Sequence, residues 1–507
     1  MSFINKIKRL FRSAAAQVIH LPIRGRFDIA QTSDGNRRHW AAADGLDADS
    51  AHNVSVRRMA VQRSRMELAN NGFGTGILRT HRNYVVGRGP KLRLQTGSPG
   101  FNAMIEARWK DWSKKVKLAI KLRTAQQART RDGESFCILR DNPNSLDPVK
   151  LDLKLVECEQ VTTPGLAMFE ANHIDGIKFD AFDNPEYFEV LPAHPGAAQY
   201  LALQQPIKVP AKFMLHLFGQ ERPSQHRAMP ELSSTLGNFA GGRRWRESTL
   251  QAAENVANFS LIVKTEAPPE TGPAQLVPFE TVEIDKGMMT ALPAGGDVFQ
   301  PKVEQPAASY TDFNRAQVSE QARPLNMPYN IAACDSSGYS FSGGKLDHLT
   351  YFEGVDIEQS ELEDLFLDPL FEVWFAEAAR VYSWYQSSPQ GNVYLSVPAH
   401  TWDWPARPII DEQKTASARQ TDLGTGVKSL RRVLAEDGYD FEEELIQMAE
   451  DYGVTVEQMR ARLFETNFRR ASAAPAEQGP GDGSQETGAG SQEKTPARNG
   501  NNGKSRF

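Results

Sequence analysis

The stretch NNGFGTGILRTHRNYVVGRGPKLRLQTG (Asn70–Gly97) has five glycines among its first twenty residues, and arginines separate its apolar runs. A Walker-type phosphate loop needs a lysine and then a serine or threonine directly after its last glycine, whereas Ile77 follows Gly76. A dinucleotide-binding loop needs an acidic residue about 20 positions further on, and none occurs between Glu67 and Glu106. The pattern therefore predicts turns at the glycines, which tolerate positive φ, and argues against a nucleotide site.

The composition around this stretch is typical of a soluble globular protein. The chain has 507 residues, of which 40% are apolar and 24% charged, so we expect two or three domains and a tail. No apolar run approaches the ~20 residues that span a bilayer. The basic N-terminus is interrupted by Ser13, Gln17 and His20, which predicts an amphipathic segment and not a secretory signal.

Cysteine and histidine spacing gives no support to metal chemistry. The three cysteines, Cys137, Cys158 and Cys334, are far apart and lack a CxxC partner, so neither a disulfide framework nor a zinc site is expected. The ten histidines form no HExxH or similar spacing. We expect no cofactor and no metal ion.

Charge is strongly segregated along the chain, although the net charge is only −5. Arg57–Arg131 contains 18 lysines and arginines against three acidic residues, a local charge of +15. Leu346–Ala379 contains ten acidic residues and no lysine or arginine. Each block is either a solvated helix face or part of a contact between subunits or with a polyanion.

Periodicity predicts a mixture of helices and strands. Trp109 and Trp112 should be buried on one side of a helix, whereas Gly241-Gly242 predicts a bend or break in the longest helix. Helical patterns cover Arg57–Gly72, Phe101–Gln127, Pro230–Lys264, Thr311–Arg323, Ser360–Trp384 and Asp411–Phe468. Strand patterns cover Tyr84–Leu94, Ser135–Arg140, Lys150–Val161 and a hairpin over Gly176–Leu191. Pro268–Gln305 is predicted to be a loop region, and the stretch from Ala471 onward is predicted to be disordered.

Three residues raise one enzymatic alternative. Asp152 and Lys154, with Asp147 upstream, resemble the D…DxK arrangement with which nucleases hold magnesium and orient a water. The basic block would then bind nucleic acid. A D-x-K pair on an alternating strand often arises by chance, so this hypothesis stays open as an alternative.

The order of motifs from about Arg57 to Phe468 resembles that of the lambda-type phage portal proteins. The matching early pattern is an arginine-rich helix, paired asparagines and a VVG-type turn, here Arg65, Asn70, Asn71, Gly76 and Val85–Gly89. Later matches are His216–Ser233, which leads into the long helix, Tyr339–Ser342 and Trp402–Leu430. Two departures are Gly343-Gly344, where the family usually has small or basic residues, and Glu412, which replaces a proline.

The resemblance implies an α+β portal fold with an α/β wing, a long channel-lining stem helix, a tunnel loop and an all-helical C-terminal crown. Mapped on this sequence, the expected divisions are a basic arm at 1–50, the wing with clip elements at 51–229, the stem helix at 230–265, the loop region at 266–310, wing helices at 311–400, the crown-like region at 401–470 and the disordered tail at 471–507.

The resemblance also implies candidate site residues. The tunnel loop would contain Leu292, Pro293, Ala294, Gly295, Gly296 and Asp297, and the stem helix would contain Leu236, Phe239, Arg243, Arg244 and Arg246. The glycines and Pro293 suit an irregular exposed path. The arginines of Asn70–Gly97 would pair with a neighbouring subunit more readily than with DNA.

The implied function is a non-enzymatic ring, usually a dodecamer, at one vertex of a phage capsid. Double-stranded DNA would pass through its channel during packaging and ejection. The implied partners are further copies of the chain, the terminase large subunit, the major capsid protein and a head-tail adaptor, with no membrane. The protein would reside in the virion after assembly in the host bacterial cytoplasm. The alternatives are a metal-dependent nuclease and another capsid or tail adaptor ring.

Overall fold

The structure is a computed structural model that describes residues 38–163, 172–197, 205–258, 262–265, 296–299, 310–384, 397–407 and 412–472. The chain divides into two compact units. The first comprises Met1–Gly87 and Asp111–Pro398, and the second comprises Arg88–Lys110 and Ala399–Phe507.

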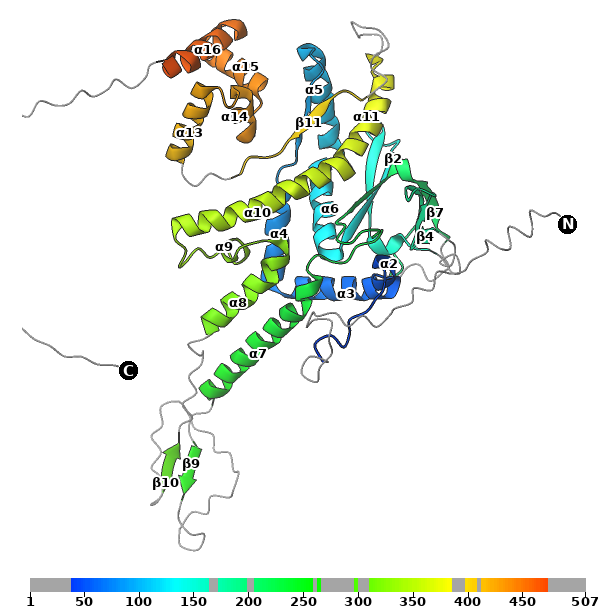
Figure 1. The fold of residues 1–507 in the computed structure, drawn as a ribbon, viewed down its shortest axis with the longest axis vertical. Helices are drawn as coiled ribbons and strands as arrows, with labels where there is room; N and C mark the ends of the chain where they lie inside the picture. The colour runs from blue at the N-terminus through cyan, green and yellow to red at the C-terminus, as the bar shows by residue number, and fades with distance from the viewer. Residues whose placement is uncertain are drawn as a thin grey trace, which may run out of the picture. The chain divides into compact units, whose positions relative to one another are not determined.

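Among the described residues, helices and three small sheets make up the first unit (Figure 1). Its helices are α2 (Ala48–Ala51), α3 (Val54–Asn70), α4 (Gly72–Val85), α6 (Leu118–Asp132), α7 (Leu236–Asn258), α8 (Tyr310–Ala322), α9 (Tyr329–Ala332), α10 (Phe341–Leu362) and α11 (Asp368–Val381). Its strands are β2 (Glu134–Asp141), β3 (Leu151–Val156), β4 (His173–Ile174), β5 (Ile177–Phe179), β6 (Pro185–Val190), β7 (Ile207–Pro210), β8 (Met214–Phe218), β9 (Ile262–Thr265) and β10 (Gly296–Phe299).

The core of this unit lies where its two larger sheets meet. The antiparallel sheets have the strand orders β3-β2-β8 and β4-β5-β6-β7. Phe136 of β2 is completely buried, and its ring lies 6.0 Å from that of Phe188 on β6. The alternation of apolar and polar residues in β3 places Leu151 and Leu153 inward, as expected for a half-buried strand. The strands predicted within Ser135–Arg140 and Lys150–Val161 and the Gly176–Leu191 hairpin are therefore confirmed.

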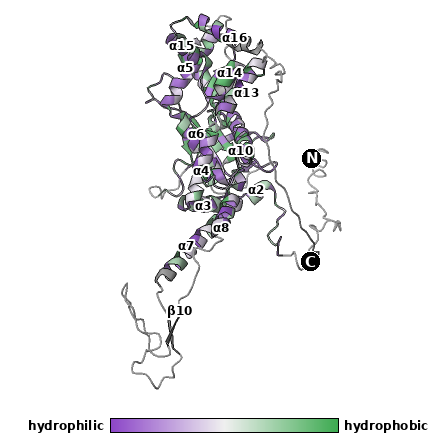
Figure 2. Ribbon diagram, turned by 90° about the vertical axis from the view of Figure 1, so that its left-hand side faces the viewer, coloured by the Kyte–Doolittle hydropathy of each residue, from purple (hydrophilic) through white to green (hydrophobic). Residues whose placement is uncertain are grey.

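A second apolar seam follows α10 and α11, which are joined by a π-helical turn, η7 (Glu363–Leu367). Figure 2 shows hydrophobic and hydrophilic residues along α10, as expected for a helix with one buried face. Trp374 of α11 lies 6.0 Å from Trp112, whose indole N–H donates to the Leu151 carbonyl at 3.0 Å. The predicted burial of Trp109 and Trp112 is confirmed.

The second unit contains a two-stranded sheet and a helical C-terminal part. Strand β1 (Lys91–Leu94) pairs antiparallel with β11 (His400–Asp403), which places Leu92 opposite Trp402. The helices are most of α5 (Pro99–Lys115), α13 (Glu412–Thr425), α14 (Leu430–Glu436), α15 (Phe441–Asp451) and α16 (Val456–Ser472). The helical prediction for Asp411–Phe468 is confirmed. The sequence patterns did not indicate that Arg88–Lys110 belongs with this distant part of the chain.

The prediction of turns throughout Asn70–Gly97 is partly wrong. Gly72–Val85 forms α4, which begins where the Asn71 side chain accepts the backbone N–H groups of Phe73 and Gly74 at 3.1 and 3.4 Å. Asparagine caps of this kind satisfy N–H groups that have no partner within the helix. Consequently Tyr84 and Val85 are helical and not part of a strand. The expected positive φ does occur later, at Gly87, Gly89 and Gly97.

Two other helix boundaries differ from the predictions. The basic pattern over Phe101–Gln127 is divided into α5 and α6 at Lys117, which has a left-handed φ of 58°. The acidic helix begins at Phe341, well before the predicted Ser360, because the Ser340 side chain caps it at the Gly343 N–H.

The longest predicted helix is shorter than its pattern but has no break at its glycines. Helix α7 runs through Gly241-Gly242 and ends at Asn258. A Cβ at position 242 would lie 3.3 Å from the Gln321 side chain on α8, so the glycine permits close helix packing at this point. Ile262–Thr265 is strand β9, which pairs with Gly296–Phe299 inside the predicted loop region.

The expected mixture of helix and strand is therefore present. In the part of the chain that the structure describes, no helix combines the length and apolar character needed to cross a bilayer. The tail predicted to be disordered lies, beyond Ser472, outside the described residues.

We expect Gly133→Ala to destabilise the first unit by at least ~2 kcal/mol. Gly133 ends α6 with a φ of 93°, and an added Cβ would lie 2.4 Å from the Met229 carbonyl carbon. Gly76→Ala is the matched control, because Gly76 lies within α4 with nothing within 4 Å of an added Cβ. That substitution should stabilise by roughly 0.5–1 kcal/mol. Urea denaturation should separate the variants, and equal behaviour would contradict this account.

Candidate functional site

Helix α7 is held by α3 and α4 along its first half. Phe239 is completely buried, and its ring comes within 3.2 Å of the position that a Cβ on Gly74 would occupy. One turn later, Arg243 reaches Glu67 of α3 at 2.8 Å. The Arg246 guanidinium lies 5.4 Å from the centre of the Phe73 ring, a favourable cation–π distance. Glu67 and Gly74 are thus supporting residues that the sequence analysis did not identify.

Aromatic side chains hold α7 against α8. Trp245 stacks on Tyr310 with 4.9 Å between ring centroids and packs against Phe313 at 4.5 Å. The two helices lie side by side in Figure 1. The first half of α7 is therefore fixed on two sides, by α3 and α4 through an apolar contact and an ion pair, and by α8 through aromatic packing.

The five residues predicted for a stem helix all lie on α7, but their surroundings differ. Phe239 is core, Leu236 is half-buried, and Arg243 and Arg246 are engaged as described. Arg244 is exposed and forms no ion pair with any residue that the structure describes. Of the three arginines, Arg244 has the freest cation.

Strands β9 and β10 form an antiparallel pair beyond α7. Ile262 is opposite Phe299, and Thr265 is opposite Gly296. Of the candidate tunnel-loop residues, Gly296 and Asp297 lie on β10, whereas Leu292–Gly295 fall outside the described residues. The adjacent β-branched residues Ile262 and Val263 were the sequence signal for this pair.

A buried ion pair connects β2 to the segment that precedes α7. The Arg227 guanidinium donates to Glu134 from Nη2 at 2.6 Å, and both side chains are 2% exposed. Arg227 also donates to the Cys158 and Val161 carbonyls at 3.2 and 3.1 Å. Burial alone would raise the pKa of Glu134, but the Arg227 charge and hydrogen bonds from His216 and Arg227 hold that pKa far below its usual value. Glu134 is therefore a carboxylate at neutral pH.

The same network extends to α3 and to the β4–β5 turn. Asp175 pairs with Arg57 of α3 and lies 3.1 Å from Arg227. A small cavity beside these groups is lined by Arg58, Glu159 and Thr162 among others, with room for about one water molecule. The cluster thus fastens elements together and offers no space for a substrate.

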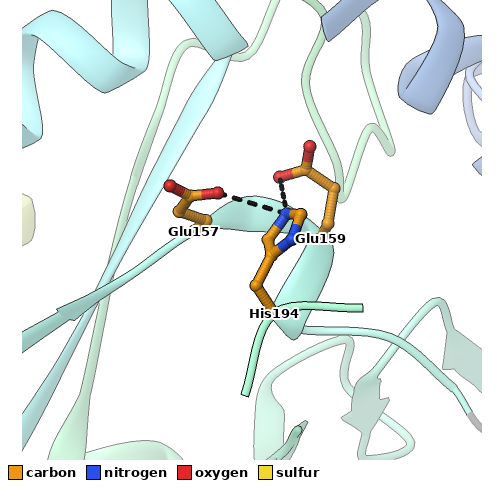
Figure 3. Close-up of side chains that lie close together, drawn as sticks. All are labelled: Glu157, Glu159 and His194. Carbon is orange, nitrogen blue, oxygen red and sulfur yellow. Dashed lines mark ion pairs between the residues drawn. The ribbon is translucent and has the colours of Figure 1, made fainter. Parts of the chain in front are cut away.

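Among the described residues, one group of three side chains could offer ligands to a metal ion: Glu157, Glu159 and His194 (Figure 3). His194 Nε2 lies 3.2 Å from Glu157 and 3.7 Å from Glu159. However, His194 Nδ1 accepts the Gly196 backbone N–H at 3.0 Å, which places the proton of the neutral ring on Nε2. A histidine that binds a metal through Nε2 instead carries its proton on Nδ1 and donates it.

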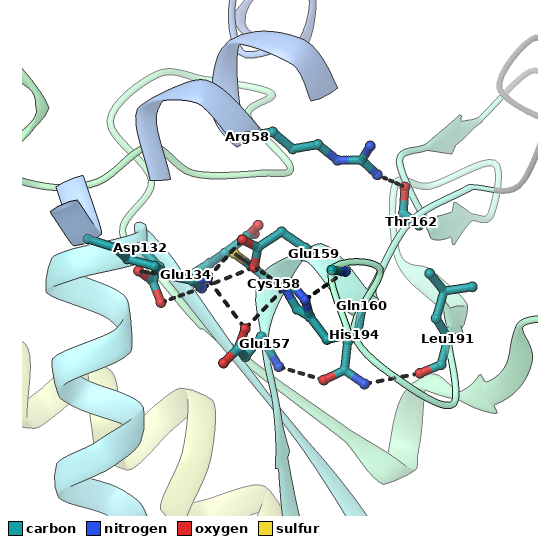
Figure 4. Close-up of polar contacts among 12 residues, drawn as sticks. Arg58, Asp132, Glu134, Glu157, Cys158, Glu159, Gln160, Thr162, Leu191 and His194 are labelled. Carbon is teal, nitrogen blue, oxygen red and sulfur yellow. Dashed lines mark hydrogen bonds and ion pairs between the residues drawn. The ribbon is translucent and has the colours of Figure 1, made fainter. Parts of the chain in front are cut away.

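Arg65 already occupies the two carboxylates of this group. Its guanidinium lies 2.9 Å from Glu159 and 3.4 Å from Glu157, and it also binds Asp132 at 2.9 Å. Figure 4 shows these carboxylates around η2 (Cys158–Gln160), together with the Arg58–Thr162 bond. The arrangement fits a set of ion pairs that anchors α3 and His194, and it does not fit a cation site.

The two carboxylates of the nuclease hypothesis are engaged by other side chains. Asp152 accepts Lys121 at 2.6 Å and Asn142 at 2.9 Å. Asp147 is buried and pairs with Lys115 at 2.9 Å. Both carboxylates are therefore taken by lysines from helices, which explains their positions without a magnesium ion.

The oppositely charged blocks meet within one chain. Arg129 of the basic block pairs with Glu361 of the acidic block and with Glu231 at 3.1 Å. Nearby, His81 lies 3.0 Å from Glu358. Burial lowers the pKa of His81, but the charge of Glu358, its hydrogen bond to the ring and the charge of Glu231 together outweigh burial, so the net shift is upward. Part of the predicted pairing between blocks is thus internal, and pairing between subunits stays a prediction for the remaining charges.

Comparisons with known proteins point in one direction. A family model described as phage portal protein, lambda family, matches residues 34–359. A protein of Halomonas phage phiHAP-1 named "Probable portal protein" is 24% identical over 422 residues, which cover 77% of this chain and 79% of that protein.

Two solved structures have weaker likeness. The neck of a native GTA particle, computed with C12 symmetry, has 13% identity and a TM-score of 0.40, covering 75% of this chain and 94% of that chain. The neck of an empty GTA particle, computed with C6 symmetry, has 12% identity and a TM-score of 0.40, covering 75% and 93%. TM-scores this low do not establish a common fold.

We expect Glu134→Gln to lower the free energy of unfolding by ~3 kcal/mol at pH 7, because it leaves the buried Arg227 charge without its main partner. Glu186→Gln, at the exposed start of β6, should change the free energy of unfolding by less than ~0.5 kcal/mol. Since the folded-state pKa of Glu134 is lowered, its contribution is present above the unfolded-state pKa of about 4.3 and is lost as the pH falls. The difference between wild type and Glu134→Gln should therefore shrink on acidification, as urea titrations at pH 7 and pH 3.5 would reveal. A difference that does not depend on pH would contradict this role.

Proposed function

The chain belongs to the lambda family of phage portal proteins, and on this basis we propose that its copies form a ring at one capsid vertex, with a channel for double-stranded DNA. The carrying observation is the family match over residues 34–359, which includes both larger sheets of the first unit, helices α3–α9 and most of α10. The phage relative is matched over most of its own length.

We assign α7 to the stem and the β9–β10 pair to the base of the tunnel loop. Two observations support this assignment. Contacts with α3, α4 and α8 fix the first half of α7, and the chain then leads into β9. Thr265 and Gly296 are paired, so the segment between them leaves and returns at one strand pair. A segment whose two ends are held by one antiparallel strand pair suits a loop that projects toward DNA.

The charges on α7 suit a channel that lets DNA slide. Each phosphate contact made by lysine or arginine adds affinity through counterion release, so many contacts would hold DNA in place. Arg243 and Arg246 are already engaged by Glu67 and Phe73, which leaves Arg244 to face solvent. With one free arginine on this part of α7 in each copy, the attraction between the channel wall and DNA stays weak.

The remaining parts of the proposal follow from family membership. The rest of the first unit would be the wing, and the helices of the second unit would be the crown. The ring would be a dodecamer that contacts the terminase large subunit, the major capsid protein and a head-tail adaptor. It would be a virion component assembled in the host bacterial cytoplasm, and terminase would supply the ATP chemistry.

We expect the purified protein to form rings with a central hole. Size-exclusion chromatography with light scattering should give a mass of many subunits, and negative-stain images should reveal annular particles. Rings held partly by ion pairs should loosen as salt rises, since the Debye length falls from about 10 Å at 0.1 M to about 3 Å at 1 M. A stable monomer across salt and protein concentration would refute the ring.

Deleting Leu292–Gly295 should leave rings intact but impair retention of packaged DNA in assembled heads. The deletion leaves intact β9 and β10, whose pairing joins the two ends of the loop. A deletion of equal length within the tail after Ser472 is the control and should not affect retention. Loss of rings would make the loop structural, and normal DNA retention with normal infectivity would place it away from the channel.

A further inference from the structure

Helix α3 has an exposed apolar stripe with one cation in it. Val56, Met59 and Met66 are 42–56% exposed, and Arg63 lies between the two methionines. The spacing of 3, 4 and 3 residues places these four side chains on one helix face. The buried residues of α3, which include Val61, Ser64 and Leu68, lie on the opposite face.

Helix α10 has a stripe of the same design and opposite charge. Leu346, Leu349 and Ile357 are 57–67% exposed, and Glu353 lies between the last two. Here the spacing is 3, 4 and 4 residues, so these side chains also share a face. Tyr351, Val355 and Gln359 are buried on the other side of α10.

The two stripes match in order as well as in charge. Each has two apolar residues, then one charged residue, then one apolar residue. Within the described residues, neither Arg63 nor Glu353 forms a hydrogen bond or ion pair through its side chain. This sets them apart from Arg57 and Arg65, which are paired within the chain.

Helix α4 holds the two striped helices at its opposite ends. Near its start, Gly74 packs against Leu68 of α3. At its end, the Val85 carbonyl accepts the Gln359 side chain of α10 at 2.8 Å. Its 14 residues span roughly 21 Å, and Figure 1 shows α4 reaching from α3 to α10. Both stripes lie on the helix faces away from α4, so one chain cannot bring them together without unfolding.

We propose that the α3 stripe of one copy packs on the α10 stripe of the next copy, with Arg63 beside Glu353. This inference rests on the proposed ring. Contacts between two different surfaces of identical chains are heterologous, and they close into a ring when the rotation between copies allows it. Exposed apolar residues at helical spacing pack ridges into grooves, and the opposite charges set which helix meets which.

A second copy is the occupant that the complementarity favours. Each copy carries both stripes, so every stripe in a closed ring finds a partner and neither stripe stays in water. Single-sign repulsion would appear only if α3 met α3 or α10 met α10. The contact is therefore directional, which a ring requires.

Charge reversal and mixing test the contact. The variants are Arg63→Glu, Glu353→Arg and their double combination, with Asp347→Arg as a control on α10 outside the stripe. Circular dichroism checks that each variant keeps its helices. Ring assembly is measured by light scattering and negative-stain imaging, as the protein concentration that gives half assembly.

Each single reversal should raise that concentration at least about tenfold, because like charges then face each other at every contact. An equimolar mixture of the Arg63→Glu and Glu353→Arg chains should recover rings, since alternating copies pair opposite charges at both kinds of contact. The double variant should also assemble, and Asp347→Arg should behave as wild type.

The failures are distinguishable. A wild type that never forms rings overturns the proposed function, and this contact with it. Wild-type rings that both single variants also form overturn the contact alone. Folded single variants that do not assemble, and that the mixture does not rescue, also overturn it. A defect in only one of the two single variants would also overturn the contact, because the stripe that carries the defect would then pack against something other than the proposed stripe.

Discussion

The buried Arg227–Glu134 pair is the constraint on which much of the first unit depends. A charge removed from water must be paired and hydrogen-bonded, or it costs several kcal/mol. Arg227 satisfies this need with the Glu134 carboxylate, the Asp175 carboxylate that it shares with Arg57, and three backbone carbonyls. Those partners come from β2, from the β4–β5 turn and from the residues around η2. Because Arg227 lies in the segment before α7, the network fixes both sheets relative to the start of the long helix, and Arg57 adds α3 through Asp175.

Sequence patterns predicted correctly those helices and strands that are determined by nearby residues. Helix α3 follows from its periodicity, and the Gly176–Leu191 hairpin follows from its turn residues, with Asp183 in the left-handed region. The glycines before Ile77 misled the prediction, because their role depends on Phe239, which is far away in the sequence and needs the space beside Gly74. The β1–β11 pairing joins residues about 300 positions apart, and periodicity carries no information about such partners.

The candidate site was predictable only in part for the same reason. The position of α7 and the arginines on it could be found from the pattern, but their engagement by Glu67 and Phe73 could not. The charge blocks were visible by counting, whereas their internal neutralisation through Arg129 and His81 required the fold. These internal pairs use only part of each block, and contacts of the remaining charges with other molecules stay a prediction. Family membership supplies the context in which those charges are interpreted.

The π-helical turn η7 has a consequence for how the family can vary in length. Each residue advances a regular α-helix by about 100°, so over the distance from Tyr351 to Trp374 an unbroken helix would turn the Trp374 face away from the Tyr351 face. The wide turn takes up one extra residue and realigns the buried sets of α10 and α11, which include Tyr351, Val355, Leu370 and Trp374. Losing one residue within Glu363–Leu367 would convert the wide turn into an ordinary one and preserve both buried faces. Relatives should therefore gain or lose single residues at this joint, while the flanking helices keep a constant length.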